Sequence, residues 1–384
     1  MKITKLMVHL VALPTRREHN WASKMSSPIG HHVIVELLTD EGIVGWGEAP
    51  AGATWGGSQM RYYGETPETV RHVTCDYLAA AIEGCDPLEL GVIHGRMDSV
   101  IKGHPYAKAA VDMACYDAAG RALGVSVSAL LGGRVRQGIE VAHSLGIMDL
   151  DDCYLEAEEA VAEGARTIKC KTGLDPERDV TLVRELRRLL GSDIKIRVDA
   201  NEAYASVHEA VDVTLRQEEF GLLLCEQPVA GALGLSRVAA RVSSPVMADE
   251  SAWTVNDILE LNELDAAACF SCYVTKPGGF YRARQQAEVA ERLGMYCDIG
   301  GSIETGIGNA ANLQLGTALA IATLPSVCPV SQPAGSSGPK VAGVYYLDDL
   351  IIEPFSFIDG AVMAPQGPGL GIEVDRKKLE RYSA

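Results

Sequence analysis

From about residue 125 onward, the chain alternates short apolar runs with longer amphipathic segments, and this alternation is the feature that most restricts its fold. The apolar runs have the length of strands, and the segments between them carry apolar residues at helical spacing, as Val180, Val183 and Leu186 do. Strands that alternate with helices pair in parallel, because each connection must cross back over the sheet. Enough units follow for eight strands, so we expect a (β/α)8 barrel of the TIM type rather than an open sheet.

The N-terminal part has a different pattern. Apolar runs at residues 31–37 and 43–48 flank Asp40-Glu41-Gly42, which predicts an antiparallel hairpin. The alanine-rich stretch 106–123 predicts a helix that Gly124 ends. The α/β chain is therefore expected to divide into an α+β capping domain at 1–125, the barrel at 126–365, and a C-terminal segment at 366–384 that returns to the capping domain.

Composition excludes several classes of partner. The chain of 384 residues has a net charge of −17, so it repels nucleic acid and anionic membranes, and we expect neither as a partner. No apolar run has the length of a membrane span, and the first residues do not form a signal peptide. The cysteines are scattered, with one CxxC at Cys269 and Cys272 in an apolar run. We therefore expect reduced, buried thiols and a cytoplasmic location.

Ionisable residues follow the apolar runs at the points where the predicted strands end. Asp199, Glu226 and Asp249 are 27 and 23 residues apart, about one strand–helix unit each. The C-terminal ends of barrel strands meet at one mouth, where barrel enzymes place their chemistry, so these side chains should converge. If these residues only marked the start of polar loops, we would expect a mixture of residue types at these positions. The complete set is Lys169, Lys171, Asp199, Glu226, Asp249 and Lys276.

Three converging carboxylates repel one another unless a cation neutralises them. Hard oxygen ligands suit Mg²⁺, with Mn²⁺ as an alternative, and no histidine or cysteine lies in zinc-ligand spacing at these strand ends. Lys169 and Lys171 should point the same way, because side chains on a strand alternate. Lys276 should approach from another side of the ring. A lysine near cations becomes a usable general base, so Lys171 and Lys276 are predicted as an acid/base pair.

The ordered set of motifs resembles the enolase superfamily, in its muconate-lactonizing subgroup, over essentially the whole chain. The motifs that carry the resemblance are Gly45-Trp46-Gly47-Glu48, Lys169-Cys170-Lys171, Asp199-Ala200-Asn201, Glu226-Gln227-Pro228, Asp249-Glu250-Ser251, Lys276 before Pro277-Gly278-Gly279, Gly300-Gly301-Ser302-Ile303-Glu304, and Gly367-Pro368-Gly369-Leu370-Gly371.

The resemblance implies a role for each matching residue. Asp199, Glu226 and Asp249 would bind Mg²⁺, and Lys171 and Lys276 would face each other across the α-carbon of the substrate. It also implies a place for Lys169 beside the substrate carboxylate, and Asn201 and Glu250 are plausible groups that orient a lysine or a metal ligand. The further candidates for contact with the substrate are Glu304, His143, Trp21 and Trp55.

Some of these placements leave alternatives. His143 either contacts the substrate or packs in the wall of the barrel. The seventh strand, 296–301, lacks the histidine base of the mandelate-racemase and dehydratase branches. Two loops, 16–28 and 51–63, are expected to cover the mouth, and their tryptophans would line the pocket or pack between the domains.

The expected activity is metal-dependent removal of the proton next to the carboxylate of a small-molecule substrate, through an enediolate. The outcome would be isomerisation, by a cycloisomerase such as muconate cycloisomerase or by a racemase or epimerase of an amino-acid derivative. The alternatives are a dehydratase of a hydroxy acid or a hydroxyproline-like substrate, and a non-catalytic binding barrel. A zinc hydrolase would need an HxH on the first strand, where Val141-Ala142-His143 stands. The resemblance also implies a homo-oligomer.

Overall fold

The computed structural model describes residues 1–21, 29–50, 52–54 and 62–384. Its N-terminal part contains an antiparallel sheet in the order β1-β2-β3, which includes the predicted hairpin of β2 (His31–Thr39) and β3 (Val44–Pro50). β1 (Ile3–Ala12) pairs with the other edge of β2. The helical elements of this part are α1 (Pro67–Val73), the π-helical turn η1 (Thr74–Leu78), α2 (Ala79–Ile82), α3 (Leu90–Val100), α4 (Pro105–Leu123) and α5 (Val127–Leu130).

Two glycines allow the sheet to pack closely against α4. A Cβ atom at Gly45 or Gly47 would overlap backbone atoms of α4, so only glycine permits this approach. Helix α4 ends where the sequence predicted, because Gly124 takes a left-handed conformation with φ 69°. The glycines of the Gly45-Trp46-Gly47-Glu48 motif therefore have a packing role.

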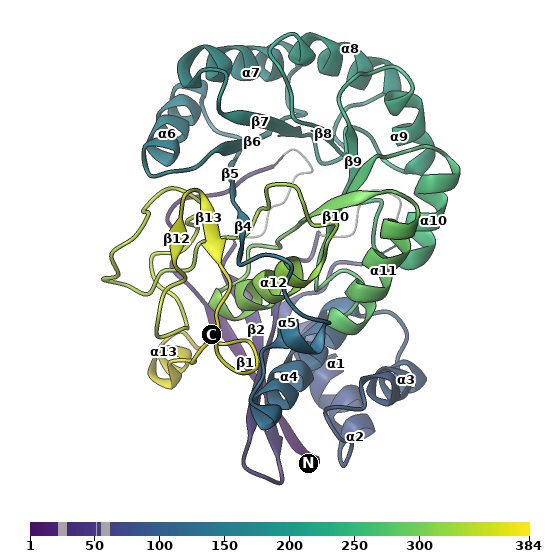
Figure 1. Ribbon diagram of the computed structural model, residues 1–384, viewed down its shortest axis with the longest axis vertical. Helices are drawn as coiled ribbons and strands as arrows, with labels where there is room; N and C mark the ends of the chain where they lie inside the picture. Colours follow the sequence, from purple (N-terminus) through teal and green to yellow (C-terminus); the bar gives the residue numbers. More distant parts are fainter. Residues whose placement is uncertain (22–28, 51, 55–61) are drawn as a thin grey trace.

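The rest of the chain forms a curled parallel sheet with helices on its outside, and the predicted barrel class is confirmed (Figure 1). The strands follow in the order β11-β10-β9-β8-β7-β6-β5, so each pairs with its neighbour along the chain. They are β5 (Ala142–Leu145), β6 (Thr167–Lys171), β7 (Lys195–Asp199), β8 (Cys225–Glu226), β9 (Val246–Ala248), β10 (Cys269–Cys272) and β11 (Tyr296–Ile299). The helices are α6 (Leu150–Ala162), α7 (Pro176–Leu190), α8 (Val207–Glu218), α9 (Ala232–Ala239), α10 (Val255–Glu263), α11 (Phe280–Arg292) and α12 (Gly306–Ala318).

The eighth unit differs from the expectation of a full strand–helix repeat. Only isolated bridges, Cys297 to Ala322 and Val141 to Ser326, join the eighth position to its neighbours. Pro325 and Pro329 lie in this segment, and a proline has no N–H to donate to a strand ladder. Residues 319–356 are all described and contain no helix. The barrel is therefore closed by an irregular segment.

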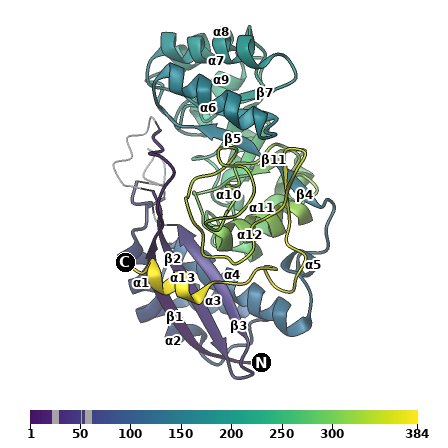
Figure 2. The same ribbon diagram turned by 90° about the vertical axis from the view of Figure 1, so that its left-hand side faces the viewer.

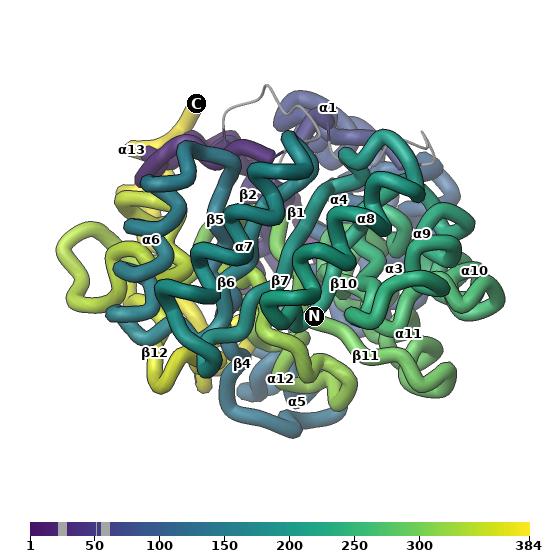
Figure 3. Tube along the Cα trace, turned by 90° about the horizontal axis from the view of Figure 1, so that it is seen from above, coloured from purple at the N-terminus to yellow at the C-terminus, as the bar shows by residue number. Residues whose placement is uncertain are grey.

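The C-terminal part returns to the N-terminal sheet. Helix α13 (Arg376–Arg381) lies over that sheet in Figure 2, and the N–H of Ala12 donates to the carbonyl of Tyr382 at 2.9 Å. Before this, the chain runs beside α6 (Figure 3), where Glu163 accepts hydrogen bonds from the backbone of Val341 and Ala342. A small sheet of β4 (Gly138–Glu140), β12 (Phe357–Ile358) and β13 (Ala361–Met363) completes the fold. The domain boundaries stay predictions.

A buried carboxylate joins the two parts of the molecule. Glu48 on β3 accepts hydrogen bonds from the backbone N–H groups of Thr305 at 2.8 Å and Gly308 at 2.7 Å, at the N-terminus of α12. It also contacts Nδ1 of His32 at 2.9 Å. Burial opposes the charge on Glu48, but His32 and Thr305 outweigh it, and the pKa of this carboxyl lies below its ordinary value. The glutamate of the motif thus holds the barrel to the N-terminal sheet.

Candidate active site

The two lysines of β6 reach the carboxylates that follow the neighbouring strands. Lys169 Nζ lies 2.8 Å from Asp199 Oδ2 and 2.8 Å from Glu226 Oε1. Lys171 Nζ lies 2.7 Å from Asp199 Oδ2. All four side chains are buried. The predicted convergence of these charges at one end of the barrel is present.

The carboxylates that Lys169 contacts set the direction of its pKa shift. Burial lowers this pKa, but the carboxylates of Asp199 and Glu226 outweigh burial and raise it. The same ion pairs, with Lys171, hold the pKa of Asp199 below its ordinary value although burial opposes this. The ammonium groups of Lys169 and Lys171 thus lie against the carboxylates of Asp199 and Glu226.

The chemistry of the donor set fits a hard divalent cation. Asp199 and Glu226 are register partners on β7 and β8, and Asp249 follows β9 directly. Carboxylate oxygens on adjacent strand ends are the donors that Mg²⁺ and Mn²⁺ prefer. Within the described residues, no group of three or more His, Cys, Asp and Glu side chains is arranged to hold a metal ion as it stands. Lys169 Nζ contacts both Asp199 and Glu226 in this structure, and Asp199, Glu226 and Asp249 are the residues that would hold the cation.

Other contacts hold the carboxylates in place. The fully buried Arg197 donates to Glu226 Oε2 at 2.6 Å and to Asp298 Oδ2 at 2.7 Å, inside the barrel. Lys171 Nζ donates to Asn201 Oδ1 at 2.8 Å, and Asn201 Nδ2 donates to Glu250 Oε1 at 2.8 Å. The contact expected of Asn201 with a lysine is therefore present.

Lys276 contacts the third predicted metal ligand. Its Nζ donates to the backbone carbonyl of Asp249 at 2.7 Å and pairs with the Asp249 carboxylate. Strand β10 ends at Cys272, and the side chains that continue its inward face are Ser271 and Tyr273. The Tyr273 hydroxyl lies 3.4 Å from Asp249 Oδ2. A role for Lys276 as the second acid/base group stays a prediction.

A cavity of about 30 Å³ lies between these groups. Ligand pockets usually have volumes of about 300–1,000 Å³, so a substrate needs side chains to move. Lys171 Nζ lies 5.8 Å from the centroid of the Trp21 ring, which places Trp21 at the cavity as expected. The described lining residues are His19, Trp21, Ser144, Lys169, Lys171, Asp249, Ser271, Tyr273, Gly300, Gly301, Ile303, Val327 and Tyr345.

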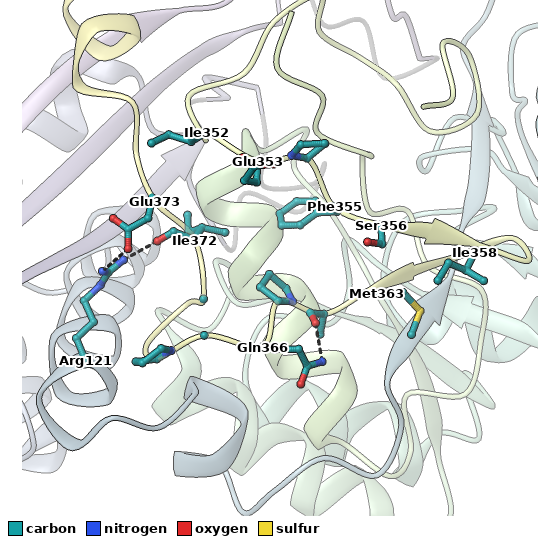
Figure 4. Close-up of a pocket in the computed structure, with 16 residues that line it drawn as sticks. Arg121, Ile352, Glu353, Phe355, Ser356, Ile358, Met363, Gln366, Ile372 and Glu373 are labelled. Atoms are coloured by element: carbon teal, nitrogen blue, oxygen red, sulfur yellow. Dashed lines mark hydrogen bonds and ion pairs between the residues drawn. The ribbon is translucent and has the colours of Figure 1, made fainter. Parts of the chain in front are cut away.

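A much larger cavity, of about 740 Å³, lies elsewhere, along the C-terminal part of the chain (Figure 4). Its charged lining residues are Arg121, Glu353 and Glu373, and Arg121 NH1 pairs with Glu373 Oε1 at 3.1 Å. None of the strand-end lysines or carboxylates lines it. The small cavity is therefore the better candidate for an active site, because acid/base groups converge there.

Two protein-family models match the chain. A family described as "Enolase C-terminal domain-like" matches residues 152–378, and "Mandelate racemase / muconate lactonizing enzyme, N-terminal domain" matches residues 7–132. The chain belongs to the enolase superfamily, in its muconate-lactonizing subgroup. It is an enzyme of this superfamily, whose members use a divalent metal ion.

Similar proteins of the superfamily have known names and structures. The chain is 30% identical to muconate cycloisomerase 1 of Rhodococcus opacus, over 100% of this chain and 99% of that protein. It is 29% identical to the N-succinyl-L-Arg/Lys racemase of Bacillus cereus, over 100% and 98%. The crystal structure of that racemase has a TM-score of 0.90 with this chain, at 27% identity and the same coverage. A dipeptide epimerase from Enterococcus faecalis, crystallised with Mg and L-Leu-L-Tyr, has a TM-score of 0.86 at 29% identity, over 97% and 100%. No described helix is long and apolar enough to cross a membrane.

Three residues predicted at the substrate are not among the described residues that line the small cavity: His143, Glu304 and Trp55. His143 packs in the wall, because Gly343 N–H donates to its Nδ1 at 2.8 Å and its Nε2 lies 2.9 Å from Glu156 Oε1. Both ring nitrogens have partners, which agrees with the alternative that His143 packs in the wall, and its contact with the substrate stays a prediction. Glu304 is not among the lining residues, because its carboxyl turns back to accept the N–H of Ser302 at 2.8 Å. Trp55 lies outside the described residues.

Burial sets the protonation of Glu304. It is buried next to the cavity-lining Gly301, and burial raises its pKa to about 7. The nearby Glu48 carboxylate adds to this rise. Glu304 thus lies beside the cavity as a carboxyl that is protonated in mild acid.

The sequence reasoning missed several residues of the site. Tyr273 could have been found by the same alternation that grouped Lys169 with Lys171, since it lies two residues after Ser271. His19 and Tyr345 come from opposite ends of the chain and are 4.9 Å apart between ring centroids. No local pattern marks such a contact, because it exists only after the chain has folded.

Proposed function

We propose that this protein is a divalent-metal-dependent isomerase that removes the proton next to the carboxylate of a small molecule, with Lys171 as the base. The observation that carries the proposal is the position of Lys171 Nζ on the cavity wall, 2.7 Å from Asp199 and 2.8 Å from Asn201. An amine at this place can take the proton from the α-carbon, and the electron pair that remains moves onto the carboxylate oxygens as an enediolate.

The residues around Lys171 supply what this charge needs. Asp199, Glu226 and Asp249 would hold Mg²⁺ or Mn²⁺, which supplies positive charge for the carboxylate oxygens when bound. Lys169, on the same face of β6, would lie near the carboxylate once its own partners have a metal to neutralise them. Glu250 accepts from Asn201, which accepts from Lys171, so this chain of contacts orients the base.

Isomerisation is favoured because the relatives named above are a cycloisomerase, a racemase and an epimerase. We propose either cycloisomerisation of a muconate-like acid or racemisation or epimerisation of an amino-acid derivative. A dehydratase of a hydroxy acid would use the same first step. A non-catalytic binding barrel would not need the buried lysines and carboxylates that this cavity holds. We also propose a homo-oligomer, which sedimentation velocity tests.

The test is hydrogen exchange at the α-carbon, followed by NMR in D₂O with Mg²⁺. The panel contains muconolactone, N-succinyl-L-arginine, N-succinyl-L-lysine, the dipeptide L-Leu-L-Tyr and a β-hydroxy acid. We expect one class to exchange, and the exchange to stop with EDTA or in Lys171→Ala. The matched control is Lys195→Ala, because Lys195 is an exposed lysine at the opposite end of β7. Exchange that persists in Lys171→Ala would contradict the proposal.

A further inference from the structure

The turn after β11 holds a β-branched residue in a left-handed backbone conformation. Ile303 has a φ of 64°, in a region that a β-branched residue occupies only at a cost in free energy. Its side chain lines the small cavity, as Gly300 and Gly301 of the same segment do. Backbone strain of this kind persists only where the surrounding structure enforces it, and it gathers at functional sites. The groups that hold Ile303 in place therefore bear on the shape of the cavity.

A phenol from the C-terminal part of the chain holds the backbone of Ile303. The Tyr346 hydroxyl donates to the Ile303 carbonyl oxygen at 2.5 Å. Burial raises the pKa of Tyr346 well above its ordinary value, so this hydroxyl keeps its proton. A hydroxyl has a single proton, so its oxygen accepts in the second hydrogen bond, of 2.9 Å, from Nε2 of His32. His32 therefore carries a proton on Nε2 and holds the phenol from behind.

His32 lies on β2 of the N-terminal sheet and is fixed on two sides. Its Nδ1 lies 2.9 Å from Glu48 Oε1, and Glu48 is the carboxylate that holds the N-terminus of α12. The imidazole ring packs edge to face against the Tyr346 ring, with centroids 5.5 Å apart and an angle of 87°. His32 is buried. These contacts give the imidazole one orientation, in which it faces the Tyr346 hydroxyl.

The residues on both sides of Ile303 are also held from outside the barrel strands. The Ser302 hydroxyl lies 3.0 Å from the hydroxyl of Tyr106 on α4. The Thr305 N–H donates to Glu48 on β3 at 2.8 Å. The turn from Ser302 to Thr305 is thus shaped by groups of the N-terminal part and by Tyr346, in addition to the strand that it follows.

Ile303 contributes an apolar surface to a cavity that also has a charged side. The charged side chains that line the cavity, Lys169, Lys171 and Asp249, suit the carboxylate of a substrate and its cation. The aliphatic side chain of Ile303 has no polar group to offer, so it suits an apolar part of the molecule. A change in the backbone conformation at Ile303 would move this surface.

We propose that Ile303 is a specificity-determining residue that contacts an apolar part of the substrate, and that Tyr346 and His32 position it. This inference rests on the proposed function, because the substrate is the carboxylate that loses its α-proton there. The hydroxyl of Tyr346 opposes the strain at Ile303, so loss of that hydroxyl lets the turn relax and displaces the apolar surface. The N-terminal sheet thereby takes part in substrate selection through His32 without touching the substrate.

The first arm of the test needs no substrate and follows amide hydrogen exchange of the whole chain by mass spectrometry. Tyr346→Phe removes the hydroxyl and keeps the ring, so we expect exchange over residues 301–308 to quicken about fivefold or more. Tyr382→Phe is the matched control, because its hydroxyl donates to Asp348 at 2.7 Å, and exchange over 301–308 should stay as in wild type. Unchanged exchange over 301–308 in Tyr346→Phe would overturn the inference while the proposed function stands.

The second arm measures α-proton exchange with Mg²⁺ for muconolactone, N-succinyl-L-arginine, N-succinyl-L-lysine and L-Leu-L-Tyr. For the compound that wild type exchanges fastest, Tyr346→Phe and Ile303→Gly should each raise KM about tenfold. We expect kcat to change less than about threefold, because Lys171 is untouched. Tyr382→Phe should change neither constant.

The double variant separates positioning from a general loss of packing. Glycine takes a positive φ without strain, so Tyr346 has no side chain to position in Ile303→Gly. The double variant should therefore have the KM of Ile303→Gly alone. Effects on KM that multiply in the double variant, or losses confined to kcat, would overturn the inference. If wild type exchanges none of the four compounds, the proposed function fails and this inference falls with it.

Discussion

The guanidinium of Arg17 and the carboxylate of Glu156 form a two-point ion pair, with Nε 2.6 Å from Oε2 and NH2 2.6 Å from Oε1. Glu156 lies on α6 of the barrel and also accepts from Arg16 NH2 at 2.9 Å. Arg17 precedes His19 and Trp21, which line the cavity. One carboxylate of the barrel therefore fixes the N-terminal segment that supplies part of the cavity wall.

Glu156→Gln should weaken both the fold and catalysis. Burial opposes the charge on Glu156, but His143, Arg17 and Arg16 outweigh it and hold its pKa well below the ordinary value. We expect the free energy of unfolding to fall by about 2 kcal/mol, since two partly exposed guanidinium groups lose the buried carboxylate that they share. We also expect kcat/KM to fall about tenfold, because His19 and Trp21 lose their anchor. Urea unfolding and steady-state kinetics measure the two effects.

The difference in stability between wild type and Glu156→Gln should depend on pH. A carboxyl with a depressed pKa stabilises the fold above its unfolded-state pKa, and this stability is lost as pH falls through the folded-state pKa. The difference between wild type and Glu156→Gln should thus be largest at neutral pH and shrink below the ordinary pKa of 4.5. Glu158→Gln, exposed on the same helix, should show neither effect. Equal stability of wild type and Glu156→Gln at pH 7 would show that Glu156 does not fix the N-terminal segment in place.

Gly300→Ala should displace Tyr273. The added Cβ atom would overlap the phenol ring, and such overpacking costs about 1–3 kcal/mol. The loss of activity should exceed what the loss of stability alone would cause, because the Tyr273 ring must leave the cavity wall. Gly95→Ala is the control: Gly95 is exposed in α3 with open space around it, so alanine should stabilise that helix by about 0.5–1 kcal/mol. Thermal unfolding compares the stability of Gly300→Ala with that of Gly95→Ala. A stable and fully active Gly300→Ala variant would show that activity does not depend on this position of the Tyr273 ring.

Glu304 should make stability fall as pH rises through mild acid. Burial raises its folded-state pKa to about 7 from an ordinary 4.5, so the folded state binds this proton more tightly than the unfolded state does. Its contribution is complete below pH 4.5 and is lost as pH rises to about 7. The loss is on the order of 3 kcal/mol at about 1.4 kcal/mol per pH unit. Glu304→Gln should flatten this part of the stability profile, and an unchanged slope in urea unfolding would contradict the assignment.

Asp199→Asn and Glu226→Gln should each abolish Mg²⁺ binding and α-proton exchange while the protein stays folded. Each change removes one charged oxygen donor and leaves the isosteric shape. Titration calorimetry measures the metal, and circular dichroism measures the fold. Asp193→Asn, an exposed carboxylate just before β7, is the control and should bind Mg²⁺ as wild type does. Undiminished turnover in Asp199→Asn or Glu226→Gln would rule out the metal site.

Much of the site could be predicted because its residues lie on alternate positions of one strand or at the ends of neighbouring strands. Lys169 and Lys171 alternate on one strand, and Asp199 and Glu226 end the next two, so periodicity and topology were enough to bring them together. The role of Lys276 stays a prediction, because the sequence does not show where β10 stops. Moving the end of that strand to Cys272 gives the inward position to Tyr273.

The sequence by itself determined the barrel class, the N-terminal hairpin and the cluster of lysines and carboxylates, since these follow from hydrophobic periodicity and from the common direction of parallel strands. Only the tertiary structure decided the contacts between distant segments. Arg17 meets Glu156, Glu48 meets the N-terminus of α12, and Gly300 leaves room for Tyr273. Such contacts depend on side-chain packing across elements, whose geometry is fixed only when the whole core closes, and no local pattern of residues carries that information.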